Sequence, residues 1–137
     1  MTRLVQVIMA AMVVLAVAGT TMAQTAKFVP PIRGEAEVGV LPPQTKVDTK
    51  TNMVITTIQV KNLSGTGSIA GLKVEEYWWD KANNPVTGSK ARLAKPLMPG
   101  EVATLTLETP KDPKMHRNNY QFSHANGKIK TKPMKAF

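Results

Sequence analysis

The sequence predicts an all-β fold, a single antiparallel β-sandwich of about seven strands preceded by a signal-peptide helix. After residue 34, seven short segments alternate apolar or β-branched residues with polar ones, which is the two-residue period of a half-buried strand. Prolines, glycines and asparagines separate these segments and mark turns. No segment after residue 23 carries the 3.6-residue apolar period of an amphipathic helix.

The first two predicted strands are residues 36–40 and 54–61. In the first, Ala36, Val38 and Val40 alternate with glutamate and glycine until two prolines end the run. The second is rich in valine, isoleucine and threonine, whose branched side chains suit a strand better than a helix. Both segments are therefore expected to bury one face.

Residues 69–79 form the third predicted strand and end on two adjacent tryptophans. Val74 and Trp78 share the apolar face, on which Glu76 is an interruption. Neighbouring residues on a strand point to opposite faces, so Trp78 and Trp79 cannot both enter the core. We expect Trp78 to be buried and Trp79 to be the more exposed ring.

Residues 86–93 and 102–108 are the fourth and fifth predicted strands. The fourth follows an Asn-Asn-Pro turn, and the fifth follows a Pro-Gly pair. In the fifth, Ala103, Leu105 and Leu107 are expected to point inward while the intervening threonines point out.

A hairpin is predicted to end the chain. Asn126 and Gly127 form the expected two-residue type I′ turn, because both residues accept positive φ. In this register residues 122–125 pair with residues 128–131, and Phe122 lies opposite Thr131. Seven short strands joined by such turns predict a sandwich of the immunoglobulin-like type.

The N-terminal segment predicts export. Residues 1–23 combine an early Arg3, an apolar run over residues 4–18 and small residues at Thr21 and Ala23, as in a cleavable secretory signal peptide. We expect residues 24–34 to be an extended leader and residues 35–137 to be the immunoglobulin-like domain. The prediction is a bacterial protein that is periplasmic or secreted, with no membrane span after cleavage. The absence of cysteine agrees with a core that needs no disulfide.

Residues 55–106 hold four motifs in a particular order. A strand ends at Lys61 and Asn62, a Ser/Gly-rich turn follows at residues 64–68, a strand closes on Tyr-Trp-Trp-Asp at residues 77–80, and Leu-Met-Pro-Gly-Glu opens a later strand at residues 97–101. This order resembles the bacterial FxLYD-type domain, an immunoglobulin or fibronectin type III-like sandwich. The resemblance implies a fold and no activity. The aromatic motif of this chain is bulkier than the family pattern.

Two groups of side chains are candidate contact sites. Tyr77 and Trp79 lie on the face of their strand opposite the core. Lys128, Lys130 and Lys132 alternate with other residues and so line one side of the last strand, in a chain of net charge +9. These features predict a non-enzymatic binding module that contacts a protein partner or an anionic envelope polymer. The alternative reading of the lysines is an edge strand protected against aggregation.

Methionine and histidine define an alternative function, a periplasmic copper carrier. Thioether and imidazole groups are suitable copper ligands. The main prediction includes no cofactor. The ligands of the copper alternative are Met98, Met115, His116, His124 and Met134.

No combination of residues predicts catalysis. Ser123 and His124 are strand neighbours that point apart, and so are Glu75 and Glu76, which excludes each as a cooperating pair. We therefore predict that the chain is not an enzyme. No specific nucleic-acid recognition is expected, because no stacking array accompanies the charge. Self-association is a further alternative, in which residues 24–34 lie along a strand edge of a neighbour in a surface or filament assembly.

Overall fold

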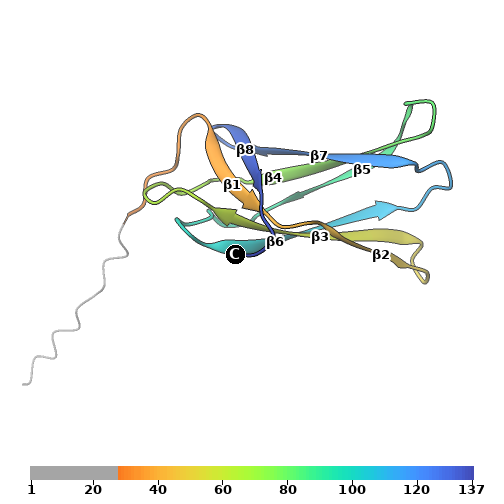
Figure 1. Cartoon of the computed structure of the whole chain (residues 1–137), viewed down its shortest axis with the longest axis horizontal. Coiled ribbons are helices and arrows are strands. Elements are labelled where there is room, and N and C mark those ends of the chain that lie inside the picture. The colour runs from red at the N-terminus through yellow and green to blue at the C-terminus, as the bar shows by residue number, and fades with distance from the viewer. Residues whose placement is uncertain (1–27) are drawn as a thin grey trace, which may run out of the picture.

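A computed structural model describes residues 28–137, which contain eight strands and no helix (Figure 1). The all-β prediction is confirmed, and the predicted signal peptide lies outside the described residues. Within the described part, no helix is long and apolar enough to cross a membrane. The strands are β1 (Ala36–Val40), β2 (Gln44–Asp48), β3 (Met53–Asn62), β4 (Lys73–Trp79), β5 (Pro85–Arg92), β6 (Val102–Pro110), β7 (Arg117–His124) and β8 (Gly127–Pro133).

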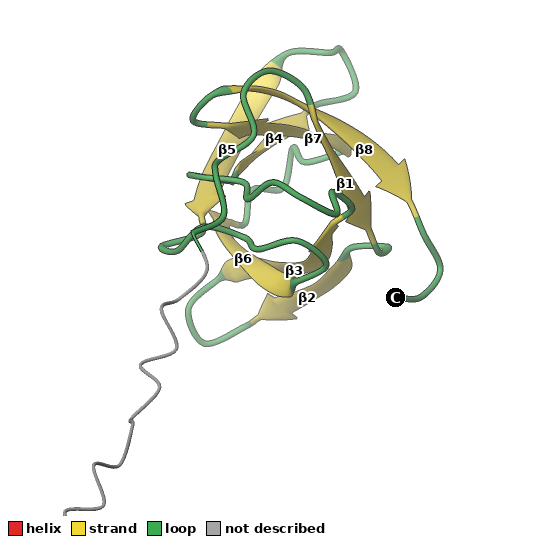
Figure 2. Ribbon diagram, turned by 90° about the vertical axis from the view of Figure 1, so that its left-hand side faces the viewer, coloured by secondary structure: helices red, strands yellow, loops and turns green. Residues whose placement is uncertain are grey.

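The strands form two layers that are joined along one side (Figure 2). In one layer, β6 pairs with one edge of β3, while β2 and β1 pair with successive parts of its other edge. In the other layer the order is β5-β4-β7-β8. β1 joins the layers because it pairs antiparallel with β3 and parallel with β8. The predicted antiparallel sandwich is correct except for this one parallel pair.

The core lies between the layers and is built from alternating apolar positions of the strands together with three residues from the segments before β4 and β6. Each of these side chains is expected to contribute about 1.5–3 kcal/mol by leaving water. The side chains that pack there include those of Val38, Ile58, Val60, Ile69, Leu72, Val74, Leu97, Leu105 and Leu107.

β2 is the strand that sequence reasoning did not predict. Four of its five residues are exposed, so its sequence, QTKVD, carries no apolar face. It is held mainly by the antiparallel ladder to β3, from Gln44 opposite Thr57 to Asp48 opposite Met53, with one side-chain contact of 3.3 Å between the hydroxyls of Thr45 and Thr56. A strand held mainly by backbone pairing leaves no period in the sequence.

The β7–β8 hairpin forms, but the predicted turn was wrong. The turn residues are Ala125 and Asn126, neither of which has positive φ, and His124 pairs with Gly127. Gly127 instead allows a close backbone contact, because a Cβ there would collide with the carbonyl oxygen of Gly34. The register moves by two residues, which leaves every β8 side chain on its expected face.

The described part of the predicted leader attaches to the loop before β4. The Ser68 amide donates to the Pro30 carbonyl at 3.0 Å, and the Ile32 amide donates to the Ser68 carbonyl at 2.8 Å. Ile32 also packs against the core, whereas Phe28 is 82% exposed. Residues 30–32 therefore belong to the packed structure.

Candidate binding face and the adjoining groove

The two tryptophans of β4 lie on opposite faces of the sheet, as the alternation predicted. Trp78 is on the inner face, where its Nε1–H donates to Glu76 at 2.7 Å. Trp79 is on the outer face, where its Nε1–H donates to Asn119 at 2.8 Å. Both rings are half-buried, so the expected full burial of Trp78 was wrong.

The outer face of β5, β4, β7 and β8 brings together the two groups of residues that the sequence placed separately. Tyr77 lies opposite Asn119 of β7, and Ser123 of β7 lies opposite Lys128 of β8. Paired residues share a face of the sheet, and alternate residues along a strand do as well. The candidate residues on this face are therefore Tyr77, Trp79, Lys128, Lys130 and Lys132.

This outer face is strongly cationic. Among the outward-facing positions of its four strands, Glu75 is the one carboxylate in the described residues, and it forms an ion pair of 2.7 Å with Lys73. Glu37 on the neighbouring β1 lies beside Lys130 in the ladder. The cationic side chains of the face are Lys73, Lys90, Arg92, Arg117, Lys128, Lys130 and Lys132.

Hydrogen bonds shift the pKa values of Glu75, which belongs to this ion pair, and of its neighbour Tyr77. The ammonium group of Lys73, and then the hydroxyl of Tyr77, lower the pKa of Glu75 below its ordinary value by bonding to the carboxylate. In return, the bond to Glu75 raises the pKa of Tyr77. The Tyr77 hydroxyl therefore stays protonated as a donor, and Glu75 stays ionised.

Arg117 contacts Trp79 at the end of the face that carries the aromatic rings. Its guanidinium carbon lies 5.3 Å from the centre of the Trp79 ring, within the range of a cation–π contact. The same guanidinium donates twice to the side-chain oxygen of Asn83, at 3.1 and 2.9 Å. Asn83 itself adopts a positive φ of 63° in the turn before β5. A cation and an aromatic ring are thus held in one arrangement.

Glu76 lies behind this face, fully buried between the layers. Besides Trp78, the hydroxyl of Thr109 donates to its carboxylate at 2.8 Å, and the amide of Asn118 and the hydroxyl of Thr56 approach it at 3.4 and 3.5 Å. Burial, and then the nearby charge of Glu76, raise the pKa of Tyr120. The alternation of residues identified Glu76 as an interruption but did not identify its donors, three of which come from other strands.

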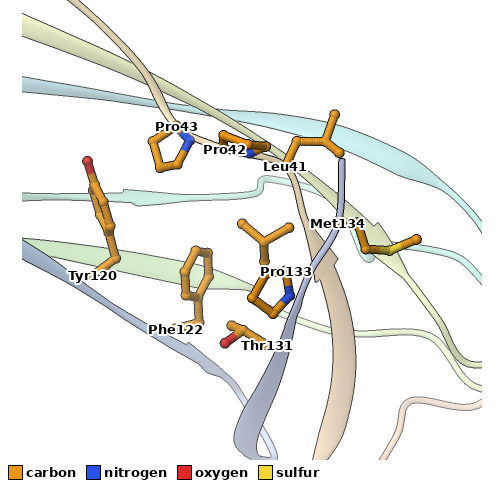
Figure 3. A pocket seen from close by; sticks show the side chains of 9 residues that line it. Leu41, Pro42, Pro43, Tyr120, Phe122, Thr131, Pro133 and Met134 are labelled. Carbon is orange, nitrogen blue, oxygen red and sulfur yellow. The ribbon is translucent and has the colours of Figure 1, made fainter. Parts of the chain in front are cut away.

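A hollow opens beside the outer face, where β7 and β8 separate (Figure 3). One cavity of about 310 Å³ is lined mainly by apolar side chains, and a second of about 470 Å³ adjoins it. Tyr120, Phe122 and Thr131 line both cavities, and we call the two adjoining cavities together the groove. Sequence reasoning missed the groove because it arises from the departure of β8 to pair with β1.

The structure does not bring the five candidate copper ligands together. His116 precedes β7, and its amide donates to the Trp79 carbonyl at 2.9 Å. His124 ends β7, and its Nε2 lies 2.6 Å from the Gly34 carbonyl oxygen. The eight residue steps from His116 to His124 along an extended strand place their Cα atoms roughly 26 Å apart. Met115 adjoins His116, Met134 lines the groove, and Met98 lies in the segment before β6.

No group of three His, Cys, Asp or Glu side chains in residues 28–137 is placed to hold a metal ion.

Comparisons with known proteins show a distant likeness of fold. No protein-family model and no curated protein matches the sequence. The structure of IrmA from Escherichia coli aligns with a TM-score of 0.47 at 9% identity, covering 74% of this chain and 94% of that one. Membership of the FxLYD-type family stays a prediction.

Proposed function

We propose that this chain is an exported, non-enzymatic binding module whose outer face, formed by β5, β4, β7 and β8, binds an anionic partner. The observation that carries the proposal is that seven cationic side chains and two aromatic rings share this face with one carboxylate, which is itself paired. Export is supported by the signal-peptide pattern of residues 1–23.

The face combines long-range attraction with defined short-range contacts. The lysines of β8 raise the local concentration of an anion and speed its encounter with the surface. Arg117 offers a planar group that is already oriented by Asn83 and Trp79, so less side-chain entropy is lost when it binds a carboxylate, sulfate or phosphate. The amides of Asn119 and Gln121 add neutral hydrogen-bonding groups.

The proposal is tested by retention on a heparin resin, which presents a dense anionic polymer. We expect the combined change Lys128→Gln, Lys130→Gln and Lys132→Gln to move elution to clearly lower NaCl, because exposed charges interact through a screened potential. Trp79→Ala should lower the NaCl concentration of elution further, because Arg117 then loses its contact with the Trp79 ring.

The matched control removes the same charge elsewhere. Lys46, Lys50 and Lys111 lie on or beside β2 and β6, in the other layer. Changing these three to glutamine gives the same net charge without altering the outer face. Equal shifts for the two triple variants would show that retention follows net charge, and the proposed face would be wrong.

A further inference from the structure

β7 has a free edge next to the groove. β8 pairs with it only at Ser123–Lys128 and His124–Gly127 and then turns away to β1 (Figures 1 and 2). Along residues 117–122, no described strand pairs with β7 on the side away from β4. A row of unpaired backbone groups of this kind is a template for another strand.

The pairing of β4 shows which backbone groups of β7 are free. The Leu93 amide donates to the Leu72 carbonyl at 2.9 Å, so even-numbered residues of β4 bond toward β5 and odd-numbered residues toward β7. By the register of β4 with β7, the odd-numbered residues of β7 return these bonds. Asn118, Tyr120 and Phe122 therefore direct their N–H and C=O groups to the open side.

The groove determines which side chains suit the inner face of an added strand. Tyr120 and Phe122 point toward Pro43 and Pro133 across an apolar hollow (Figure 3). No aspartate or glutamate lines either cavity. In an antiparallel pair the residues opposite Asn118, Tyr120 and Phe122 share their face of the sheet, so apolar side chains are favoured at these positions.

The outer face determines which side chains suit the alternate positions of the added strand. The residues opposite Arg117, Asn119 and Gln121 would project from the cationic face, near Lys128 and Lys130. Acidic side chains complement this charge.

We propose that the free edge of β7 binds an extended peptide segment of a partner protein as an added antiparallel strand, in which apolar residues facing the groove alternate with acidic residues facing the lysines. This inference rests on the proposed function, and it names the anionic partner as a protein segment. Backbone bonds would supply affinity, and the alternating side chains would supply selectivity.

The first test uses a capped hexapeptide of alternating valine and glutamate. We expect it to bind and to slow hydrogen exchange about tenfold at the amides of Asn118, Tyr120 and Phe122, because these amides gain partners. The corresponding valine–lysine peptide should not bind. Binding without protection of these three amides would overturn the proposal, and so would equal binding of the lysine peptide.

Two N-methylated forms of the hexapeptide examine the backbone bonds on the unaltered protein. Methyl groups on the valine nitrogens block the donors that face β7, so binding should weaken by tenfold or more. Methyl groups on the glutamate nitrogens point away from β7 and should be tolerated. A loss with both forms, or with neither, contradicts an added antiparallel strand.

A protein variant separates the peptide site from the proposed anion-binding face. Thr131 is exposed and lines both cavities, so Thr131→Trp should fill the groove and weaken the hexapeptide at least about tenfold. Its elution from heparin should not change. Strong heparin retention with no peptide binding would defeat the edge proposal alone, whereas heparin retention that ignores the β8 lysines would defeat the proposed function.

Discussion

Thr109 of β6 donates a hydrogen bond of 2.8 Å to the carboxylate of Glu76 on β4, so a polar contact crosses the core from one layer to the other. Trp78 donates to the same carboxylate from the second layer at 2.7 Å. A buried carboxylate is tolerated when donors surround it, and its directional bonds fix how the layers sit against each other.

Thr109→Val should lower the free energy of unfolding by about 1.5–3 kcal/mol, because the change keeps the volume of the side chain but removes a donor from a buried charge. Urea unfolding measures the loss. Thr106→Val on the exposed face of β6 is the matched control and should stay within about 0.5 kcal/mol of the unaltered chain. Similar values for the two variants would show that the Thr109 bond adds nothing.

Trp78→Ala should cost about 3 kcal/mol of unfolding free energy, because a large inner-face ring is lost together with a donor to Glu76. Trp79→Ala should cost only about 1 kcal/mol, since its contacts to Arg117 and Asn119 lie on the exposed face. Chemical denaturation of both variants gives the comparison. A larger cost for Trp79→Ala would reverse our assignment of the two faces.

Gly127→Ala should destabilise the fold by about 1–3 kcal/mol, because the added methyl group collides with the Gly34 carbonyl and the backbone must move. At Gly65 a Cβ would meet no atom within 4 Å. Gly65→Ala should therefore be neutral or slightly stabilising through the unfolded state. Thermal unfolding of the two variants tests whether the close approach of Gly127 to the Gly34 carbonyl affects stability.

Lys73→Met should raise the pKa of Glu75 toward its ordinary value, because the largest cause that lowers it is removed. A carboxyl whose folded-state pKa is lowered stabilises the fold above its unfolded pKa, and this contribution is lost as the pH falls through the folded pKa. The variant should therefore lose less stability in acid. Carboxyl titration by NMR measures the pKa, and Lys90→Met, which removes a weaker interaction, should raise it less.

Local alternation predicted seven of the strands and the faces of β4, because burying one face leaves a period in the sequence. The motif order also placed Asn62 at a strand end, and the structure shows it at the end of β3, where its amide donates to the carbonyls of Gly67 and Leu97 at 2.9 Å each. The Leu97 contact spans 35 residues and has no local signal. β2 has no local signal either, because most of its side chains are in water and backbone hydrogen bonds hold it to β3.

The candidate site was predicted in its parts and not as a whole. The alternation of side chains along each strand placed Trp79 and Lys128 on outward faces. Only the β4–β7 and β7–β8 registers show that these two faces are the same face of one sheet. The groove depends on β8 leaving β7 for β1. Pairing between the two ends of a chain is not encoded in any short segment.

The parallel ladder between β1 and β8 also sets the order in which the chain can fold. Ala36 pairs with Ile129, 93 positions later, so this closure must wait until β8 is available. Contacts of such high sequence separation are slow to form because a long loop must close first. A chain emerging from its N-terminus therefore keeps β1 without its second partner until residues 129–133 have been made.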